Sequence, residues 1–196
     1  FYEMAFEHLR AEDKIFPCYC SRKDILSAAS APHEEVVNTN NTNIYPGTCR
    51  NNTGNNKNID TGRVPAWRYR VPENTITFTD QIMGPVSQNL HLDVGDFVIR
   101  RSDNLFAYQL AVVIDDALMA VTDVLRGADL LDSTARQIEL YRVLGFNIPR
   151  FWHVPLMKDN TGNRLSKRDG SDSLNVLRDQ GAKPDEIIGQ LAASVG

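Results

Sequence analysis

The chain has 196 residues, 42% of them hydrophobic and 23% charged, and a formal net charge of −4 at pH 7. These values are those of an ordinary soluble globular protein, long enough for one domain plus an insertion. No apolar run reaches the roughly 20 residues of a membrane span and no signal-peptide pattern opens the chain, so we expect a cytoplasmic protein without a membrane partner. The negative charge argues against a large nucleic-acid surface and leaves local basic patches, such as Arg100-Arg101, for any RNA contact.

Helical patterns occur at both ends of the chain and in its second half. Residues 1–16 place four apolar side chains on one face, those of Tyr2, Ala5, Phe6 and Leu9. Ser133-Thr134 and Gly145 bracket an amphipathic run as N-cap and C-cap. After residue 170 two further helices are expected, the second beginning at Pro184, a residue suited to the first helical turn.

All three cysteines lie in the first third of the chain. Cys18 and Cys20 form a C-x-C pair, and Cys49 follows four residues after Tyr45. Three cysteines in a cytoplasmic protein favour a metal or reduced thiols over a disulfide. Zinc requires a fourth ligand, for which His33 is the nearby conventional choice, while buried cysteines without a metal are the alternative. Asn-rich tracts on both sides of Tyr45 are expected to form loops.

Strand patterns fill residues 64–101. Alternation in residues 66–71 and 75–80, with turn residues between them, predicts a hairpin. Gly84-Pro85 predicts the next turn, and a further strand is expected around Phe97–Ile99. From the residues alone this segment is either a β meander that only packs or an insertion with a binding role.

The apolar run Leu110–Ile114, which stops at Asp115-Asp116, is typical of a buried strand in a parallel sheet. Residues 151–156 predict another short strand, in which His153 is interpreted as a satisfied structural side chain rather than a catalytic one. A strand, a polar crossing and a helix form half of a βαβ unit. Ligands of such sheets bind where strand C-termini meet polar loops, so the two aspartates are expected to line a site.

Four motifs, taken in order, resemble class I glutamyl-tRNA synthetases and, within them, the glutamyl-Q tRNA(Asp) synthetase branch. They span Gly95–Asp103, Ala107–Asp116, Arg126–Thr134 and Arg164–Arg168. The resemblance covers the whole chain except the Asn-rich insert. It implies an α/β fold: a partial Rossmann-like catalytic domain with a zinc-containing insertion, a β-rich insertion and the start of a helical subdomain.

The resemblance also implies a division of the chain. Residues 1–15 would end the first Rossmann half, 16–63 would form the zinc-binding module, and 64–101 the β-rich insertion that guides the tRNA acceptor end. Residues 102–170 would form the second Rossmann half and 171–196 the start of the helical subdomain. A Gly/His-containing phosphate-binding loop of this class is not found in the sequence, so we expect a fragment that is inactive by itself.

Tyr108 and Arg126 match the positions with which this family binds L-glutamate. The chemistry agrees, because a guanidinium can hold a carboxylate through two parallel hydrogen bonds. Glutamine has no side-chain carboxylate to pair with Arg126. Polar sites discriminate best against an analogue that lacks the group they bind. From the residues alone, a core aromatic for Tyr108 and a surface ion pair for Arg126 remain equally open.

The motif RLSKR resembles the second signature of class I synthetases, which binds ATP. Its residues are Arg164, Leu165, Ser166, Lys167 and Arg168. Lys167 occupies the catalytic position, where a mobile cation stabilises the charge that develops on the departing pyrophosphate. Without the other motifs, a solvated basic loop would be the simpler interpretation.

The glutamyl-Q branch also has a zinc site in which a tyrosine completes three cysteines, and the chain matches it at Cys18, Cys20, Tyr45 and Cys49. The segment between Cys20 and Tyr45 is longer than usual. The implied function is ATP-dependent activation of L-glutamate, with Mg²⁺, and its transfer to queuosine in the anticodon of tRNA(Asp) by a monomer. The alternatives are a catalytic fragment of a glutamyl-tRNA synthetase that charges tRNA(Glu), or a non-catalytic zinc- and RNA-binding remnant.

Overall fold

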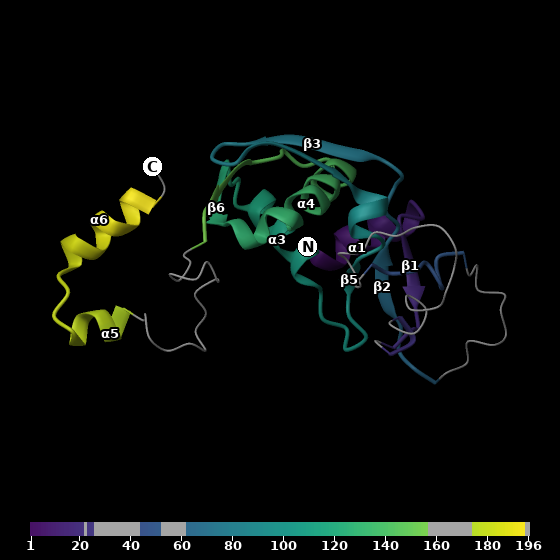
Figure 1. Cartoon of the computed structure of the whole chain (residues 1–196). Helices are drawn as coiled ribbons and strands as arrows, with labels where there is room; N and C mark the ends of the chain where they lie inside the picture. The colour runs from purple at the N-terminus through teal and green to yellow at the C-terminus, as the bar shows by residue number, and fades with distance from the viewer. Residues whose placement is uncertain (22, 26–43, 52–61, 157–173, 195–196) are drawn as a thin grey trace, which may run out of the picture.

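The computed structural model describes residues 1–21, 23–25, 44–51, 62–156 and 174–194 (Figure 1). The chain opens with helix α1 (Tyr2–Ala11), as predicted, and Phe6 and Leu9 are its buried residues. Near the other end lie α5 (Leu174–Asp179) and α6 (Pro184–Ser194), which confirm the two expected helices. In the part of the chain described, no helix combines the length and apolar character of a membrane span.

Three strands form an antiparallel sheet beside α1. Their order is β1 (Ile15–Cys18), β2 (Ala66–Tyr69) and β5 (Val98–Arg100), so β2 is paired along both edges. Trp67 on β2 meets Phe6 of α1 edge to face, with ring centroids 5.3 Å apart. This contact joins the helix to the sheet.

The predicted strands exist, but the predicted hairpin pairing is wrong. Because β2 already has two neighbours, the strand after it pairs elsewhere: β3 (Thr75–Asp80) forms a hairpin with β4 (Gly84–Asn89). Gly84 and Pro85 lie within β4, so they do not form the predicted turn. The turn comes earlier, where Asp80 Oδ1 accepts hydrogen bonds from the N–H groups of Ile82 and Met83, as turn aspartates do. A short π-helix, η1 (Leu90–Val94), leads on to β5.

The run Leu110–Ile114 is helical, contrary to the predicted strand. It lies in α3 (Tyr108–Leu118), whose buried residues Leu110, Val113 and Ile114 have the i, i+3, i+4 spacing of a helix face. The parallel pair is formed instead by β6 (Asp123–Gly127) and β7 (Arg150–Val154). The strand expected over residues 151–156 is thereby confirmed.

The helix between these strands begins earlier than predicted. A turn of 3-10 helix, η2 (Ala128–Leu130), runs directly into α4 (Leu131–Val143), so Ser133 and Thr134 lie inside the first turn instead of capping it. Their hydroxyl groups bond to other parts of the molecule: Gln109 Nε2 donates to Ser133 Oγ at 3.1 Å. Gly145 follows the helix with φ +70°, as expected of a residue that ends one.

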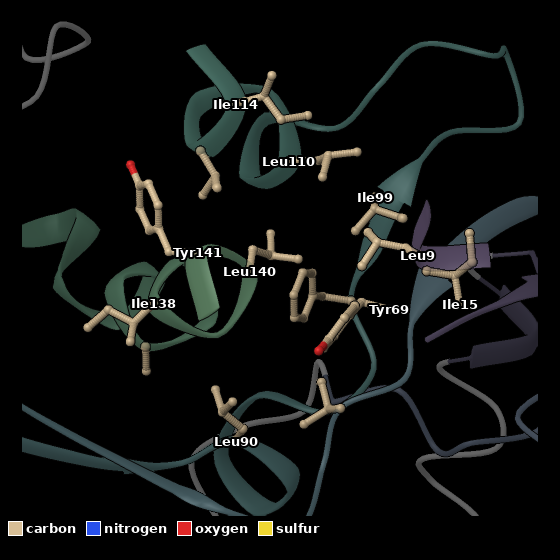
Figure 2. Close-up of a cluster of buried hydrophobic side chains, with 14 of the residues drawn as sticks. Leu9, Ile15, Tyr69, Leu90, Ile99, Leu110, Ile114, Ile138, Leu140 and Tyr141 are labelled. Carbon is tan, nitrogen blue, oxygen red and sulfur yellow. The ribbon is translucent and has the colours of Figure 1, made fainter. Parts of the chain in front are cut away.

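The main core lies where α1, α3 and α4 meet the three-stranded sheet (Figure 2). Leu9, Ile99, Leu110 and Leu140 have no exposed surface. The hydroxyl of the buried Tyr69 donates to Glu139 at 2.8 Å, which satisfies its polar end within the core. This core fixes α3 and α4 beside β6 and β7. The predicted glutamate-binding residues lie on two of these elements, Tyr108 on α3 and Arg126 on β6.

Candidate functional site

Strand register places the predicted glutamate-binding arginine against a buried histidine. Arg126 on β6 is the register partner of His153 on β7. The end of β3 reaches the same place, because Gln81 N donates to Phe151 O at 2.9 Å. Asp80, the last residue of β3, is thereby brought to the histidine ring.

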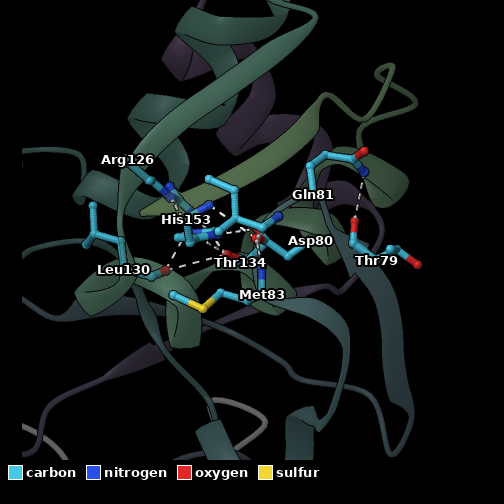
Figure 3. Close-up of polar contacts among 9 residues, drawn as sticks. Thr79, Asp80, Gln81, Met83, Arg126, Leu130, Thr134 and His153 are labelled. Carbon is cyan, nitrogen blue, oxygen red and sulfur yellow. Dashed lines mark hydrogen bonds and ion pairs between the residues drawn. The ribbon is translucent and has the colours of Figure 1, made fainter. Parts of the chain in front are cut away.

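Hydrogen bonds join these side chains into one network (Figure 3). His153 Nδ1 lies 2.6 Å from Asp80 Oδ2, and its Nε2 lies 2.9 Å from Arg126 Nε. Arg126 Nη2 donates to Thr134 Oγ1 at 2.9 Å. Asp80, Thr134 and His153 are at most 1% exposed, so solvent hardly competes with these contacts. Arg126 therefore rests on a preorganised and largely dry support.

The donors in the network determine the tautomer of His153. A guanidinium only donates, so Nε2 must accept and the proton of the neutral ring lies on Nδ1, from which it is donated to Asp80. Burial by itself would raise the pKa of Asp80, but the N–H of Met83 and the His153 ring hold that pKa below its usual value. The carboxylate stays ionised and satisfied.

Only one edge of the Arg126 guanidinium is engaged by the network. Nε donates to His153, and Nη2 donates to Thr134 and, at 3.5 Å, to Leu130 O, while Nη1 with the outer side of Nη2 forms the terminal edge. That edge matches the two oxygens of a carboxylate. Burial lowers the pKa of Arg126, yet an arginine remains charged across the accessible pH range. Among the described residues no carboxylate lies within ion-pair distance of it, so the surface ion pair is not found.

Tyr108 is the first residue of α3, and its side chain is 51% exposed. The core-aromatic alternative is therefore wrong. Its hydroxyl interacts with Arg126 and favours a raised pKa of the guanidinium, against the effect of burial. The structure thus brings together the two residues predicted to bind glutamate.

A second cluster gathers the four predicted zinc ligands. The Sγ atoms of Cys18, Cys20 and Cys49 lie within 4.8 Å of one another. Tyr45 Oη lies 3.4 Å from Cys18 Sγ and 3.9 Å from Cys20 Sγ, and Cys20 and Cys49 are 3.5 Å apart. A tetrahedral zinc with Zn–S bonds of about 2.3 Å sets S···S near ~3.8 Å and S···O near ~3.5 Å. These four atoms fit that geometry.

The electrostatics of the cluster also favour a cation. Burial, the contact with Cys49 and the nearby Cys18 raise the pKa of Cys20 to about 12. Burial alone would raise the pKa of Cys18 too, but Tyr45 and Arg68 lower it. Bringing several thiols this close makes their joint ionisation costly, and a bound zinc ion would compensate that cost.

Arginine–aromatic contacts attach the cysteine cluster to the sheet. Arg68 of β2 lies over the Tyr45 ring at 4.0 Å, and Arg70 lies over Phe16 at 5.1 Å. Arg50 bonds to the buried Asp96, which also accepts from Val71 N. Gly95, with φ +67°, allows the close approach, because a Cβ there would lie 2.7 Å from Ile44.

Residues 2–193 match the family described as tRNA synthetases class I (E and Q), catalytic domain. The chain belongs to this family. Among curated relatives, the Glutamyl-Q tRNA(Asp) synthetase of Symbiobacterium thermophilum is 47% identical over 97% of this chain and 58% of its own length. The protein of the same name from Deinococcus radiodurans is 47% identical over 90% of the chain and 58% of its own length. The chain thus spans just under three fifths of each.

Solved structures agree on the fold. A glutamate tRNA ligase from Elizabethkingia meningosepticum, in complex with its amino acid, superimposes with a TM-score of 0.69 at 23% identity. The match covers 97% of this chain and 43% of that chain. Glutamate-tRNA synthetase from Elizabethkingia anophelis gives a TM-score of 0.64. At this identity the likeness establishes the fold alone; together with the family match it confirms the predicted class I synthetase catalytic domain.

Other predicted residues of this synthetase domain have different outcomes. Asp115 and Asp116, expected to line a site, accept hydrogen bonds from Tyr2 (2.5 Å) and Tyr141 (3.3 Å) and so connect α3 to α1 and α4. The ATP loop Arg164–Arg168, with Lys167, and the candidate ligand His33 lie outside the described residues.

Sequence reasoning missed Asp80 and Thr134 as parts of the synthetase site. Thr134 was assigned to a helix cap, and Asp80 to the end of a strand. The contact of the end of β3 with β7 brings Asp80 to His153, and the packing of α4 beside β6 brings Thr134 to Arg126; no local pattern indicates either arrangement. His153 was interpreted correctly as a satisfied side chain, although its partners could not be named from the sequence.

Proposed function

We propose that this chain forms the second part of the catalytic domain of a ligase that activates L-glutamate with ATP and transfers it to tRNA(Asp). The observation that carries the proposal is the open terminal edge of Arg126, held by a dry network and next to Tyr108. The proposed acceptor is the queuosine base of the anticodon, in keeping with the name shared by the relatives at 47% identity.

Arg126 would bind the side-chain carboxylate of glutamate through two charge-assisted hydrogen bonds from Nη1 and Nη2. Glutamine offers one oxygen and an NH₂ group, so one guanidinium N–H would face a donor. A site built to hydrogen-bond a given group rejects an analogue that lacks it by a large factor. Arg126 would therefore set the amino-acid specificity.

The activation step joins the α-carboxylate of glutamate to the α-phosphorus of ATP and releases pyrophosphate. We assign the RLSKR motif to this step, with Lys167 stabilising negative charge on the leaving group and Arg164, Leu165, Ser166 and Arg168 forming the rest of the loop. Mg²⁺ bound to ATP would supply further charge neutralisation.

Cys18, Cys20, Tyr45 and Cys49 would hold one zinc ion. A zinc with four protein ligands has no open coordination position, so its role would be to stabilise the fold and not to take part in the reaction. The surrounding arginine–aromatic contacts would then fix the module on the sheet.

ATP–pyrophosphate exchange in the complete enzyme that contains these residues tests the amino-acid assignment. Exchange should depend on L-glutamate and be negligible with L-glutamine or L-aspartate. We expect little turnover from residues 1–196 alone. Exchange driven equally well by L-glutamine would overturn the assignment.

The acceptor is tested separately, with radiolabelled glutamate and purified tRNAs. Glutamate should be transferred to tRNA(Asp) that carries queuosine, and not to the same tRNA without the modified base or to tRNA(Glu). Efficient charging of tRNA(Glu) would contradict the proposed acceptor and leave the glutamate assignment in place.

A further inference from the structure

His153 has no exposed surface, yet one of its two ring nitrogens contacts a residue outside the core. One ring nitrogen faces Asp80 at 2.6 Å and the other faces Arg126 at 2.9 Å, a residue that is only half buried. The ring also stacks on Phe151, with centroids 6.3 Å apart and an interplanar angle of 17°. The His153 ring therefore lies between the Asp80 carboxylate and the Arg126 guanidinium, and one of its faces stacks on Phe151.

The order of donors in this chain of contacts is fixed. Asp80 Oδ1 accepts three backbone N–H groups, from Ile82, Met83 and His153, at 2.8 to 3.2 Å. Its other oxygen is left for the Nδ1–H of the ring, which leaves Nε2 as an acceptor pointing at Arg126. A backbone turn thus determines the tautomer, and the tautomer determines where Arg126 Nε can donate.

Arg126 in turn contacts three acceptors and one aromatic ring. Nε donates to His153 and Nη2 to Thr134 and, more weakly, to Leu130 O at 3.5 Å, while the Phe151 ring lies 5.3 Å from the guanidinium carbon. Two hydrogen bonds along one edge fix the plane of a guanidinium as well as its position. The direction of the terminal edge is therefore set by groups that do not themselves reach the open side.

We propose that His153, oriented by Asp80, is a positioning residue that sets the guanidinium plane of Arg126 for the side-chain carboxylate of glutamate. This inference rests on the proposed function. A side chain that only filled the core would need the contact to Asp80, but it would not need an acceptor facing Arg126.

Two amide substitutions separate these roles. His153→Asn keeps an N–H near the position of Nδ1, so it can donate to Asp80, but it is too short to reach Arg126. His153→Gln can place its amide oxygen near the position of Nε2 and accept from Arg126. The readout is the KM for L-glutamate in pyrophosphate exchange by the complete enzyme, with the KM for ATP, kcat and the thermal unfolding midpoint measured beside it.

A positioning role predicts that His153→Asn raises the KM for glutamate about tenfold, the loss of one hydrogen bond to a charged group, and leaves the KM for ATP unchanged. His153→Gln should recover most of that loss. Trp152→Phe, the control on the same strand, removes only a bond to the exposed Asp123 and should leave both constants unchanged.

Equal KM values in the two amide variants, or a smaller increase in His153→Asn, would overturn the positioning role and leave the proposed function standing. Absence of glutamate-dependent exchange in the unsubstituted enzyme would instead overturn the proposed function, and the inference with it. Should neither variant fold, nitrogen NMR of unsubstituted His153 decides the matter. A scalar coupling across the hydrogen bond from Arg126 Nε–H to an unprotonated Nε2 is expected, and a proton on Nε2 or the absence of that coupling would refute the role.

Discussion

The two polar clusters of this chain, the cysteine cluster and the network around Arg126, differ in whether they contain a cation. In the cysteine cluster, three sulfur atoms lie within 4.8 Å of one another beside a phenol oxygen, and none of these atoms carries a positive charge. Around Arg126, donors and acceptors alternate from Asp80 through His153 to the guanidinium and satisfy one another. The first arrangement could hold a positive ion, whereas the second already contains a cation, Arg126, whose terminal edge faces away from the network.

Exposure separates the clusters in the same way. Cys18, Tyr45 and Cys49 are at most 6% exposed and Cys20 is half-buried, while Tyr108 is half exposed and Arg126 half-buried. A mostly buried set of ligands suits an ion that stays bound, and an accessible charged edge suits a ligand that must enter and leave. The comparison therefore supports our proposals of a stabilising ion for one cluster and a substrate carboxylate for the other.

Cys49→Ser should give the largest effect, because structural zinc sites contribute on the order of 10 kcal/mol and the loss of a thiolate weakens the metal greatly. We expect zinc content well below one per chain and a thermal unfolding midpoint lower by many degrees. Ser21→Ala, next to Cys20, removes only hydrogen bonds with the exposed Asp24 and should keep the zinc. Full zinc content in Cys49→Ser would break the assignment of this cluster.

Arg126→Ala should lower kcat/KM for glutamate activation by about a thousandfold, since two charge-assisted hydrogen bonds of about 2 kcal/mol each are lost. Arg150→Ala is the matched control. That arginine lies on β7 with an exposed ion pair to Asp123 at 2.8 Å, which is worth little. Near-normal kinetics in Arg126→Ala would show that the network around Arg126 is not part of the glutamate site.

Tyr45→Phe tests whether the tyrosine oxygen is a ligand in the cysteine cluster. The ring keeps its stacking with Arg68, but the Cys49 N–H, now 2.7 Å from the tyrosine oxygen, loses its acceptor. An unsatisfied buried donor costs about 1 to 3 kcal/mol. Denaturant unfolding should show this loss in the chelator-treated protein and a larger loss in the zinc-loaded protein. Equal losses in both forms would exclude the oxygen as a ligand.

The smallest effect concerns pH and the network around Arg126. Burial by itself would raise the pKa of Asp80, but hydrogen bonds from the Met83 N–H and from His153 lower the folded-state pKa below its ordinary 3.8. The stability that Asp80 contributes is therefore complete above pH 3.8 and is lost as the pH falls through the folded-state pKa. Asp80→Asn should lose less stability than the unsubstituted chain over this acid range. Parallel stability curves for the two proteins would contradict the satisfied-carboxylate interpretation.

The sequence predicted the two clusters better than it predicted the scaffold. The ligand set and the Tyr108–Arg126 pair followed from motif order, and the structure brings each set together. The run Leu110–Ile114 was predicted as a strand because it is apolar without interruption, but a helix with a wide buried face has the same composition. Its i, i+3, i+4 burial becomes visible only once the neighbouring elements are known.

Strand pairing could not be predicted for a different reason. Residues 66–71 and 75–80 alternate as hairpin strands do, but β2 is occupied on both edges by β1 and β5, which are distant in sequence. The contact between Asp80 and His153, 73 residues apart, depends on that same long-range arrangement. The support of Arg126 is therefore a property of the fold, while its carboxylate-binding chemistry belongs to the residue itself.

A crystal structure of the complete enzyme with bound L-glutamate tests whether Arg126 binds the side-chain carboxylate. We expect the side-chain carboxylate within hydrogen-bond distance of Nη1 and Nη2 of Arg126, with Nε still donating to His153. A side-chain carboxylate held by other residues, with the terminal edge of Arg126 turned away from it, would contradict the account.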